Sequence, residues 1–235
     1  MVRPRTTEEV AAVVARCTQQ SVAILPQGGN TSLCGGSIPL AGERGIVLSL
    51  SRMRKVREID VANNSMTVEA GCVLAEVQRT AVEAGRFYPV SLGAEGSCQI
   101  GGNIATNAGG TGVLRYGNTR ENVLGLEVVL PSGSIWNGLR ALRKDNTGFD
   151  LKHLFIGSEG VLGIITAATL KLHPLNTHNL AAWLAPVSLD AAVELLGRFQ
   201  SSLGPQLSAF EILNSLQVQL VLTQMPGNHC PLAAH

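Results

Sequence analysis

The sequence predicts a mixed α and β fold, because segments with helical periodicity alternate with short apolar runs and glycine-rich loops. Its 235 residues are enough for one large domain or two modest domains. The composition, 45% hydrophobic with 26 glycines, is typical of a globular protein that is rich in tight turns. No internal repeat is found, which argues against solenoids and propellers.

The N-terminal half begins with a predicted helix of about three turns. Thr6 or Thr7 is its expected N-cap, Glu8 and Glu9 follow, and apolar residues recur at helical spacing as far as Cys17. Beyond this helix, apolar runs predict four strands, and renewed helical spacing predicts a second helix. The strands are expected at residues 22–25 (ended by Pro26), 46–50, 56–59 and 66–69, and the helix at 74–84.

The second half is less regular. Residues 87–117 contain many small residues and little periodicity, and so long a stretch without regular structure is expected only where it has a function. The character of the sequence changes after the strand predicted at 162–172, which places a domain boundary near residues 174–179. The C-terminal tail closes no element, so we expect the natural sequence to continue or to be altered there. The elements predicted from apolar runs are strands at 123–130, 162–172, 180–184 and 207–213, and helices at 189–203 and 216–222.

Charge and cysteine usage exclude several classes of function. The net charge is +1, from 18 basic and 17 acidic residues without long runs of either sign, so neither nucleic acid nor an acidic membrane is an expected partner. Five scattered cysteines without CxxC spacing predict no disulfide framework and no zinc site. No apolar N-terminal segment or run of about 20 apolar residues is present, which favours a cytoplasmic location.

Familiar catalytic motifs are absent as well. The sequence has no GxGxxG that opens a helix, no Walker A motif, no GxSxG and no HExxH. Its five histidines show no metal-ligand spacing, so no metal site is predicted in this chain. Small-molecule chemistry on the glycine-rich loops remains the favoured expectation.

Three glycine-rich segments are candidates for a ligand site. The first is PQGGNTS at 26–32, where main-chain N–H groups could converge on a pyrophosphate without a cationic side chain. The second runs from PVSLG at 89–93 through IGGNIATNAGG at 100–110 to RYG at 115–117, and its small residues would let a planar ring lie against the backbone. The third is FIGSEGVLGIIT at 155–166. Any one of these alone is also compatible with a tightly packed turn.

Four motifs, taken in order, closely resemble the FAD-binding domain of the vanillyl-alcohol-oxidase (PCMH-type) flavoproteins. They are PQGGNTSLCGGSIP, VEAGCVLAEVQRTAVEAGRFYPVSLGAEGSCQIGGNIATNAGG, RYGNTRENVLGLEVVLPSG and DLKHLFIGSEGVLGIIT. The resemblance covers about residues 2–174, AFEIL at 209–213 extends it, and the nearest members are the FAD-linked D-lactate, glycolate and D-2-hydroxyglutarate dehydrogenases. It implies an α+β fold with an FAD-binding domain at 1–175, made of two subdomains (about 1–58 and 59–175), and the start of a substrate (cap) domain at 176–235.

The resemblance also implies where FAD binds. Residues 28–31 would hold the pyrophosphate, the segment from Gly102 to Gly110 would line the flavin and ribityl chain, and Glu159, Gly160 and Ile165 would lie near the adenosine. Relatives with covalent FAD carry His where this chain has Asn30, so noncovalent FAD is predicted. The predicted cofactor-binding residues are Pro26, Gln27, Gly28, Gly29, Asn30, Thr31, Ser32, Pro89, Gly93, Gly101, Gly102, Asn103, Thr106, Asn107, Gly109, Gly110, Tyr116, Gly117, Glu159, Gly160, Gly163, Ile164 and Ile165.

The activity implied is oxidation of a small D-2-hydroxy acid to the 2-oxo acid, with electrons passed to an electron-transfer flavoprotein, a cytochrome or a quinone. In relatives the histidine base and a divalent metal belong to the C-terminal half of the family, and nothing here matches them, so no catalytic residue is predicted in this chain. Arg115 and Arg120 are loop arginines for which a salt-bridging or solvated role is expected.

Alternatives remain open at this level. The chain could be a non-catalytic FAD-binding or electron-transfer subunit, a fragment without a stable fold, or an oxidase of the same fold that acts on an alcohol or a sugar. Assembly as a homodimer or with a partner subunit is left open too. In a eukaryote with a transit peptide outside this sequence, the location would be mitochondrial rather than cytoplasmic.

Overall fold

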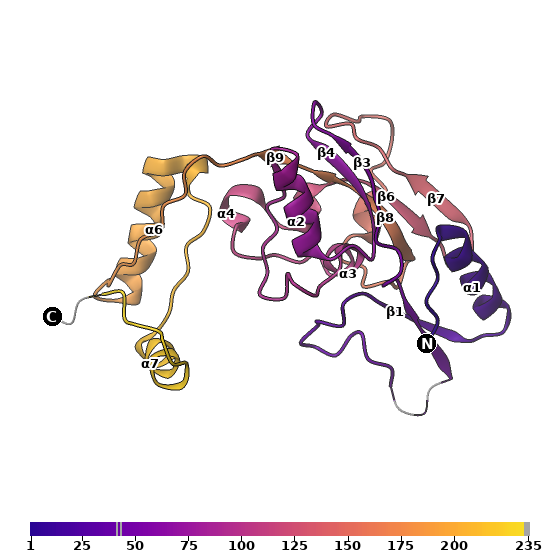
Figure 1. The fold of residues 1–235 in the computed structure, drawn as a ribbon, viewed down its shortest axis with the longest axis horizontal. Coiled ribbons are helices and arrows are strands. Elements are labelled where there is room, and N and C mark those ends of the chain that lie inside the picture. The colour runs from indigo at the N-terminus through magenta and orange to yellow at the C-terminus, as the bar shows by residue number, and fades with distance from the viewer. Residues whose placement is uncertain (41, 43, 233–235) are drawn as a thin grey trace.

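The computed structural model describes residues 1–40, 42 and 44–232 and shows the expected mixture of helices and strands (Figure 1). The elements, in chain order, are α1 (Thr7–Gln19), β1 (Ala23–Gln27), β2 (Gly45–Ser49), β3 (Val56–Asp60), β4 (Ser65–Glu69), α2 (Leu74–Glu83), β5 (Arg86–Phe87), α3 (Ile100–Ala105), α4 (Val113–Tyr116), η1 (Thr119–Asn122), β6 (Val123–Val129), β7 (Ile135–Gly138), α5 (Lys152–Phe155), β8 (Ile164–Lys171), β9 (His173–Pro174), α6 (Leu189–Leu203), η2 (Gly204–Gln206) and α7 (Ser215–Gln224).

The largest sheet has five strands in the order β3-β4-β8-β6-β7, and every neighbouring pair is antiparallel. Its inner strands β6 and β8 are buried along almost their whole length, which explains why they read as apolar runs rather than alternating patterns. Strands β1 and β2 form a separate parallel pair, and β5 pairs with β9. The first strand therefore belongs to a separate sheet, and the glycine-rich loop follows it.

Helix α1 forms for the reasons that the sequence predicts. The Thr6 side chain accepts a hydrogen bond from the Glu9 main-chain N–H at 3.2 Å, which caps the first turn. Val10, Val14 and Cys17 fall on one face and are buried, and the helix contacts β6 and β7 (Figure 1).

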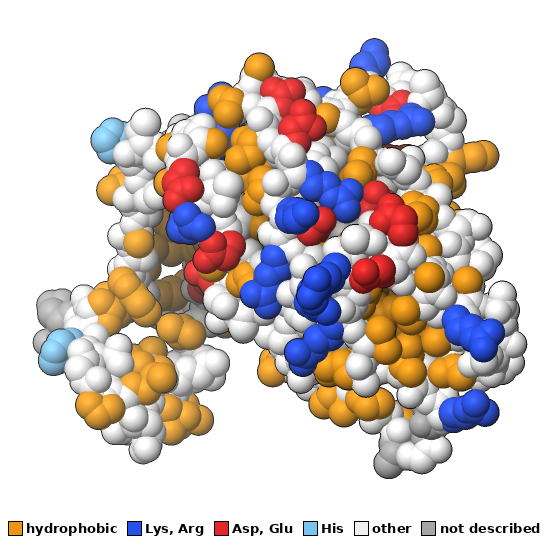
Figure 2. All heavy atoms as spheres, turned by 45° about the vertical axis from the view of Figure 1, so that its right-hand side comes forward, with side chains coloured by type: hydrophobic (Ala, Val, Ile, Leu, Met, Phe, Trp, Pro, Cys, Tyr) orange, Lys and Arg blue, Asp and Glu red, His pale blue; other side chains and the backbone are white. Residues whose placement is uncertain are grey.

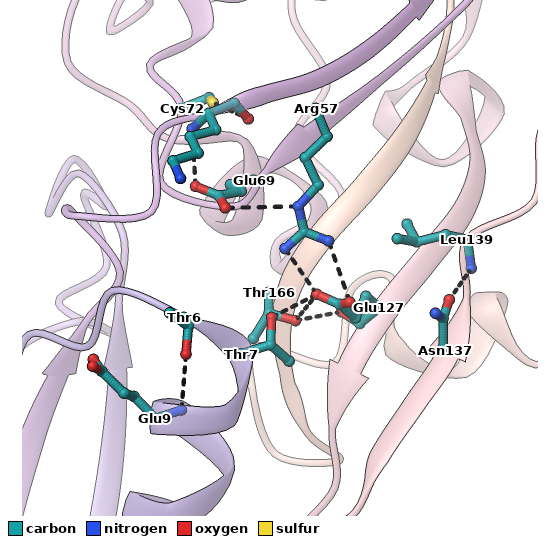
Figure 3. Close-up of polar contacts among 11 residues, drawn as sticks. Thr6, Thr7, Glu9, Arg57, Glu69, Cys72, Glu127, Asn137, Leu139 and Thr166 are labelled. Atoms are coloured by element: carbon teal, nitrogen blue, oxygen red, sulfur yellow. Dashed lines mark hydrogen bonds and ion pairs between the residues drawn. The ribbon is translucent and has the colours of Figure 1, made fainter.

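A buried polar network joins five elements (Figure 3). Glu127 on β6 accepts hydrogen bonds from Thr7 of α1 at 2.7 Å and Thr166 of β8 at 2.8 Å. Arg57 on β3 donates to both Glu127 carboxylate oxygens at 3.2 Å and lies 3.6 Å from Glu69 at the end of β4. Burial alone would raise the pKa of Glu127, but the hydrogen bonds from Arg57, Thr7 and Thr166 outweigh it and hold that pKa below its ordinary value. The network ties the sheet to α1 through one ionised group.

Some sequence predictions are wrong. The first strand does not stop before Pro26, because β1 continues to Gln27. Within the described part of the chain its one strand neighbour is β2, and a strand with one free edge tolerates the missing N–H of proline. Residues 87–117 are not free of regular structure, since they contain α3 and α4, which form despite their glycines. The strands predicted at 180–184 and 207–213 are extended chain without a hydrogen-bonded neighbour among the described residues.

The C-terminal part projects from the rest of the molecule and contacts it where η2 meets α4 (Figure 1). Helix α6 covers the predicted range and α7 exceeds it by a residue or two, but after residue 172 only Ala192 is a buried apolar residue among those described. Figure 2 shows apolar side chains gathered on the C-terminal lobe, which holds α6 and α7. Leu216, Leu220 and Met225, at or next to α7, are more than half exposed. No helix of the described part of the chain has both the length and the apolar character needed to cross a bilayer.

Candidate functional site

A cavity of about 600 Å³ lies where three glycine-rich segments meet. The segments are the loop after β1, the region leading into α3, and the loop before β8. The cavity is lined by Pro26, Gln27, Gly28, Gly29, Asn30, Thr31, Ser32, Leu33, Gly36, Ser37, Leu50, Ala70, Leu92, Gly93, Ala94, Gln99, Gly101, Gly102, Asn103, Ala105, Thr106, Ala108, Glu159, Gly160, Gly163, Ile164 and Ile165.

The loop after β1 is held open by its own side chains. Gln27 donates through Nε2 to the Ser37 carbonyl at 2.9 Å, and the Ser37 hydroxyl donates to Asn30 Oδ1 at 2.7 Å. Asn30 has φ of +54°, a left-handed conformation that asparagine tolerates better than most residues. Within the described residues, the main-chain N–H groups of 29–33 donate to no protein acceptor. They are therefore available to an anionic ligand, in the manner of an anion-binding nest.

The glycines of the first and second segments approach each other closely. A Cβ built on Gly28 would lie 3.5 Å from the Gly102 Cα, whereas one built on Gly102 meets no atom nearer than 3.9 Å. Gly29 differs, because its Cβ would lie 2.1 Å from the Ser97 carbonyl oxygen. Gly28 and Gly102 thus keep the cavity wide, while Gly29 is required by packing.

The third segment closes the cavity beside β8. Glu159 has φ of +51°, and its main-chain N–H donates to the Ala105 carbonyl at 2.9 Å, which fixes this loop against α3. A Cβ on Gly160 would lie 2.9 Å from Cγ of Pro26, so the first and third segments also touch. Among the described residues of the lining, Glu159 is the one charged side chain, and no Lys, Arg or His is found. An anion in this cavity must therefore be held by neutral N–H and O–H donors.

The structure brings together most of the residues predicted from the sequence. The cavity lining includes all seven at 26–32, five of the second segment (Gly93, Gly101, Gly102, Asn103, Thr106) and five of the third (Glu159, Gly160, Gly163, Ile164, Ile165). Six predicted residues do not line it: Pro89, Asn107, Gly109, Gly110, Tyr116 and Gly117.

Two of these six, Asn107 and Gly110, shape the wall behind the cavity. Asn107 accepts a hydrogen bond from the Arg120 main-chain N–H at 3.0 Å through Oδ1, and its φ is +47°. A Cβ on Gly110 would lie 2.2 Å from the Ser91 carbonyl oxygen, so a larger residue does not fit. The Arg120 guanidinium, for which a salt-bridging or solvated role was expected, donates to the main-chain carbonyl of His153 at 2.9 Å and lies outside the cavity.

Tyr116 belongs to an aromatic cluster rather than to the cavity. Its ring lies 4.8 Å from the His173 ring and 5.7 Å from that of Phe87, and the Arg115 guanidinium lies over it at 5.0 Å. Burial, with a smaller contribution from nearby cations, lowers the pKa of His173 to about 4, and its Nε2 lies 3.1 Å from Asn122 Oδ1. The neutral His173 is a packing residue at the start of β9.

Sequence reasoning missed several lining residues, of which Gln99 is the most informative. Gln99 is 5% exposed, and its Oε1 has no hydrogen-bond partner among the described residues. Leu50, Ala70 and Leu92 were also missed, because single apolar residues carry no signal of a ligand site in a sequence. The described residues hold no cluster of three or more His, Cys, Asp or Glu side chains that could bind a metal ion.

Comparison with known proteins decides the family. A family described as FAD binding domain matches residues 1–138, more than half of the chain. The chain belongs to the FAD-binding domain family. In the solved structures, this FAD-binding domain is similar to alkyldihydroxyacetonephosphate synthase, with a TM-score of 0.73, 27% identity, and coverage of 86% of this chain and 36% of that one. These matches confirm the predicted family, fold class and cofactor, FAD.

Curated relatives carry names of dehydrogenases. The mitochondrial D-2-hydroxyglutarate dehydrogenase of Bos taurus is 45% identical over 232 residues, which cover 99% of this chain and 42% of the relative. The D-2-hydroxyglutarate dehydrogenase of Xanthomonas citri pv. viticola is 44% identical, with 98% and 48% covered, and the putative mitochondrial D-lactate dehydrogenase of Schizosaccharomyces pombe is 40% identical, with 98% and 43% covered. The FAD-binding domain chain thus spans less than half the length of these relatives.

The cavity fits FAD on structural grounds. Its volume of about 600 Å³ lies in the range typical of cofactor sites. The free N–H groups at 29–33 suit a pyrophosphate, and the open faces of Gly93 and Gly102 leave room that a side chain would fill. The side-chain carbonyl oxygen of Gln99, Oε1, is buried without a hydrogen-bond partner among the described residues.

Proposed function

We propose that this chain supplies the FAD site of a dehydrogenase that oxidises a small D-2-hydroxy acid, with D-2-hydroxyglutarate the first candidate and D-lactate the second. The observation that carries this proposal is the glycine-lined cavity in a chain 45% identical to a D-2-hydroxyglutarate dehydrogenase. Bound FAD would supply the acceptor for the hydride that leaves the hydroxy acid.

In this proposal the chain's own residues bind and orient the cofactor. The N–H groups of residues 29–33 would hold the pyrophosphate, Gly93, Gly102 and Thr106 would face the flavin and ribityl chain, and Glu159 and Gly160 would lie near the adenosine. Asn107 and Gly110 would contribute indirectly, by fixing the backbone that forms the wall behind the cavity. The link to FAD is noncovalent in this proposal, because Asn30 offers no nucleophile to the flavin ring.

The catalytic histidine and any divalent metal are proposed to come from residues outside this chain. Electrons would pass to an electron-transfer flavoprotein, a cytochrome or a quinone. A cytoplasmic location is proposed for a bacterial source and a mitochondrial one for a eukaryotic source, since the relatives from Bos taurus and Schizosaccharomyces pombe are named mitochondrial.

We further propose the division into an FAD-binding domain at 1–175, with subdomains at about 1–58 and 59–175, and the start of a substrate domain at 176–235. It is supported by the near absence of buried residues after residue 172. Limited proteolysis tests it: cleavage between residues 176 and 188 should release an N-terminal piece that still binds FAD. Loss of FAD binding after that cleavage would contradict the division.

The function is tested by titration of the purified chain with FAD, followed by visible absorption, and then by addition of D-2-hydroxyglutarate or D-lactate without oxygen. The matched controls are the L-enantiomers of the same acids, which have identical charge and size. We expect saturable FAD binding and no bleaching of the flavin band, because the base lies outside this chain.

Each outcome decides a different part of the proposal. Bleaching by a D-acid alone would support the substrate class but contradict the absence of the base from this chain. Bleaching by both enantiomers would contradict the proposed stereospecificity. Failure to bind FAD would refute the proposed site.

A further inference from the structure

A second cavity, of about 680 Å³, shares no lining residue with the glycine-lined cavity. It lies between β7, the loop 139–151 that follows β7, the start of β6 and the end of β8. Its lining holds three of the chain's 17 acidic residues but five of its 18 basic ones, Arg120, Arg140, Arg143, Lys152 and Lys171. Positive charge is therefore concentrated here, in a chain whose net charge is only +1.

The loop that forms one wall of the second cavity is held in place by hydrogen bonds. Arg140 donates to Asp145 Oδ2 at 2.8 Å and to the Thr147 hydroxyl at 2.9 Å. Asn63 Nδ2 donates to the Ala141 carbonyl at 2.8 Å, which ties the loop to the turn between β3 and β4 (Figure 1). Hydrogen bonds from Thr147 and Arg140 lower the pKa of Asp145 to about 2, so this carboxylate is ionised and neutralises Arg140. The wall is thus a defined surface.

Three of the five cations are not neutralised by the wall itself. The Arg120 guanidinium donates to two main-chain carbonyls, which carry no net charge. Arg143 and Lys171 make no ion pair with a described residue, and Glu121 is the one described lining carboxylate without a cationic partner. Burial is the main cause of the low pKa of His173, but Lys171 and Arg143 lower it further, so their positive charge acts beyond the cavity.

Large apolar side chains stand beside these cations. Phe149 is 95% exposed and Leu142 is 60% exposed, and both line the second cavity. Trp136 of β7 also lines it, and the Trp136 ring lies 5.3 Å from that of Phe155. Exposed apolar groups rimmed by charge mark sites of protein interaction, and aromatic residues and arginine are enriched at such interfaces. The lining therefore offers a partner both positive charge and an apolar contact.

We infer that the second cavity is the docking site of an acidic protein partner, whose carboxylates meet Arg143 and Lys171 and whose apolar side chain packs on Phe149. Charge complementarity selects an acidic segment, and the apolar contact selects a protein over a small anion. A flat anionic membrane fits less well, because it would not enter a cavity and three carboxylates share the lining. The inference does not depend on FAD, since the two cavities have separate linings.

The test measures binding of a fluorescent synthetic peptide, a run of glutamates around one leucine, by fluorescence anisotropy. The variants are Arg143→Glu, Lys171→Gln and Phe149→Ser, and the matched control is Lys144→Glu. Lys144 is exposed and adjacent to Arg143 but does not line the cavity, so its replacement changes the net charge equally. We expect the dissociation constant to rise about tenfold in Arg143→Glu and about threefold to tenfold in Lys171→Gln and Phe149→Ser, with little change in Lys144→Glu.

Two further peptides separate the charge from the apolar contact. A peptide with lysine in place of each glutamate should bind Arg143→Glu better than it binds the unchanged protein, because the charges are exchanged. A peptide with serine in place of leucine should bind the unchanged protein more weakly and should be insensitive to Phe149→Ser, because the two changes remove the same contact. The unfolding midpoint and FAD binding of Arg143→Glu and Phe149→Ser should match those of the unchanged protein, since both side chains are exposed.

The remaining outcomes each overturn the inference or free it from the proposed function. If Lys144→Glu weakens peptide binding as much as Arg143→Glu, only net charge matters and no site exists. If the serine peptide binds as tightly as the leucine peptide, the occupant is a simple anion. Loss of phosphatidylserine vesicle binding in Arg143→Glu would indicate a membrane instead, and loss of a dimer in Phe149→Ser would indicate a second copy of this chain. Peptide binding without FAD binding would refute the proposed function and leave this inference standing.

Discussion

Replacement of Arg57 by leucine should destabilise the protein strongly, because Arg57 neutralises two buried carboxylates (Figure 3). It contacts both oxygens of Glu127 at 3.2 Å and Glu69 at 3.6 Å, and these glutamate side chains are only 11% and 10% exposed. Breaking a buried ion pair costs about 3–5 kcal/mol, and partial exposure of Arg57 reduces this to about 2–4 kcal/mol. For a chain of this size the midpoint of thermal unfolding should fall by about 5–15 °C.

The assay is circular dichroism during thermal and urea unfolding, with Arg79→Leu as the matched control. Arg79 also contacts two glutamates, but its side chain is 58% exposed, so its replacement should leave the midpoint almost unchanged. Glu69 precedes Ala70, whose carbonyl accepts the Gly101 N–H at 2.8 Å, so Arg57→Leu should also weaken FAD binding, and Arg79→Leu should not. A shift in Arg57→Leu no larger than in Arg79→Leu would refute this account of the network.

Three further predictions concern the cavity, the pH dependence of stability and the C-terminal lobe. Gly102→Leu should abolish FAD binding without lowering the unfolding midpoint, because its side chain enters the cavity. Gly96→Leu, whose built Cβ meets nothing within 4 Å and which does not line the cavity, should bind FAD normally, and equal affinities of the two variants in a titration would contradict this. The pKa of Glu127 in the folded protein is below its ordinary value of 4.5, so its ionised form stabilises the protein above that value, and this stabilisation is lost as the pH falls towards the folded-state pKa. In urea unfolding from about pH 6 to about pH 3, the free energy of unfolding should therefore fall more steeply in the unchanged protein than in Glu127→Gln. Leu216→Lys should reduce self-association measured by light scattering at an unchanged unfolding midpoint, and a monomeric parent protein would show this prediction to be wrong.

The elements that the sequence predicted well are those whose local signals agree with their surroundings. Helix α1 has a threonine N-cap and an apolar face that packs against β6 and β7. The inner strands β6 and β8 are apolar because both of their faces are covered. In contrast, residues 180–184 carry the same apolar signal but have no strand beside them among the described residues, and no property of the segment itself reveals this.

Helix α3 shows the opposite case, in which surroundings impose a structure that the local sequence disfavours. Its sequence, IGGNIA, contains two glycines, each of which costs about 1 kcal/mol relative to alanine in a helix. The first turn forms because the Ile100 N–H donates to the Cys72 carbonyl at 2.9 Å and the Gly101 N–H donates to the Ala70 carbonyl at 2.8 Å. Both acceptors follow β4 directly, so the helix depends on a contact that is distant in the sequence.

The part of the site that is built from glycine-rich segments was predictable from the sequence. Three glycine-rich segments could be found without a structure, and the cavity joins them. Gln99 could not be found in this way, because a single glutamine has no signature in composition or spacing. Only the packing around it, which leaves its Oε1 without a partner among the described residues, distinguishes it from an ordinary cap residue.

The glycines of the cavity divide into two groups, and this division determines how any variant should be interpreted. At Gly29 and Gly101 an added Cβ would lie 2.1 Å and 2.7 Å from protein atoms, so substitution there disturbs the packing of the loops before any ligand is present. At Gly93 an added Cβ meets nothing within 4 Å, and at Gly102 it meets only the Gly28 Cα at 3.9 Å, so substitution there acts on the ligand before it acts on the packing. Loss of FAD binding in a Gly29 variant therefore reports on folding, whereas the same loss in a Gly102 variant reports on the space that the cofactor occupies.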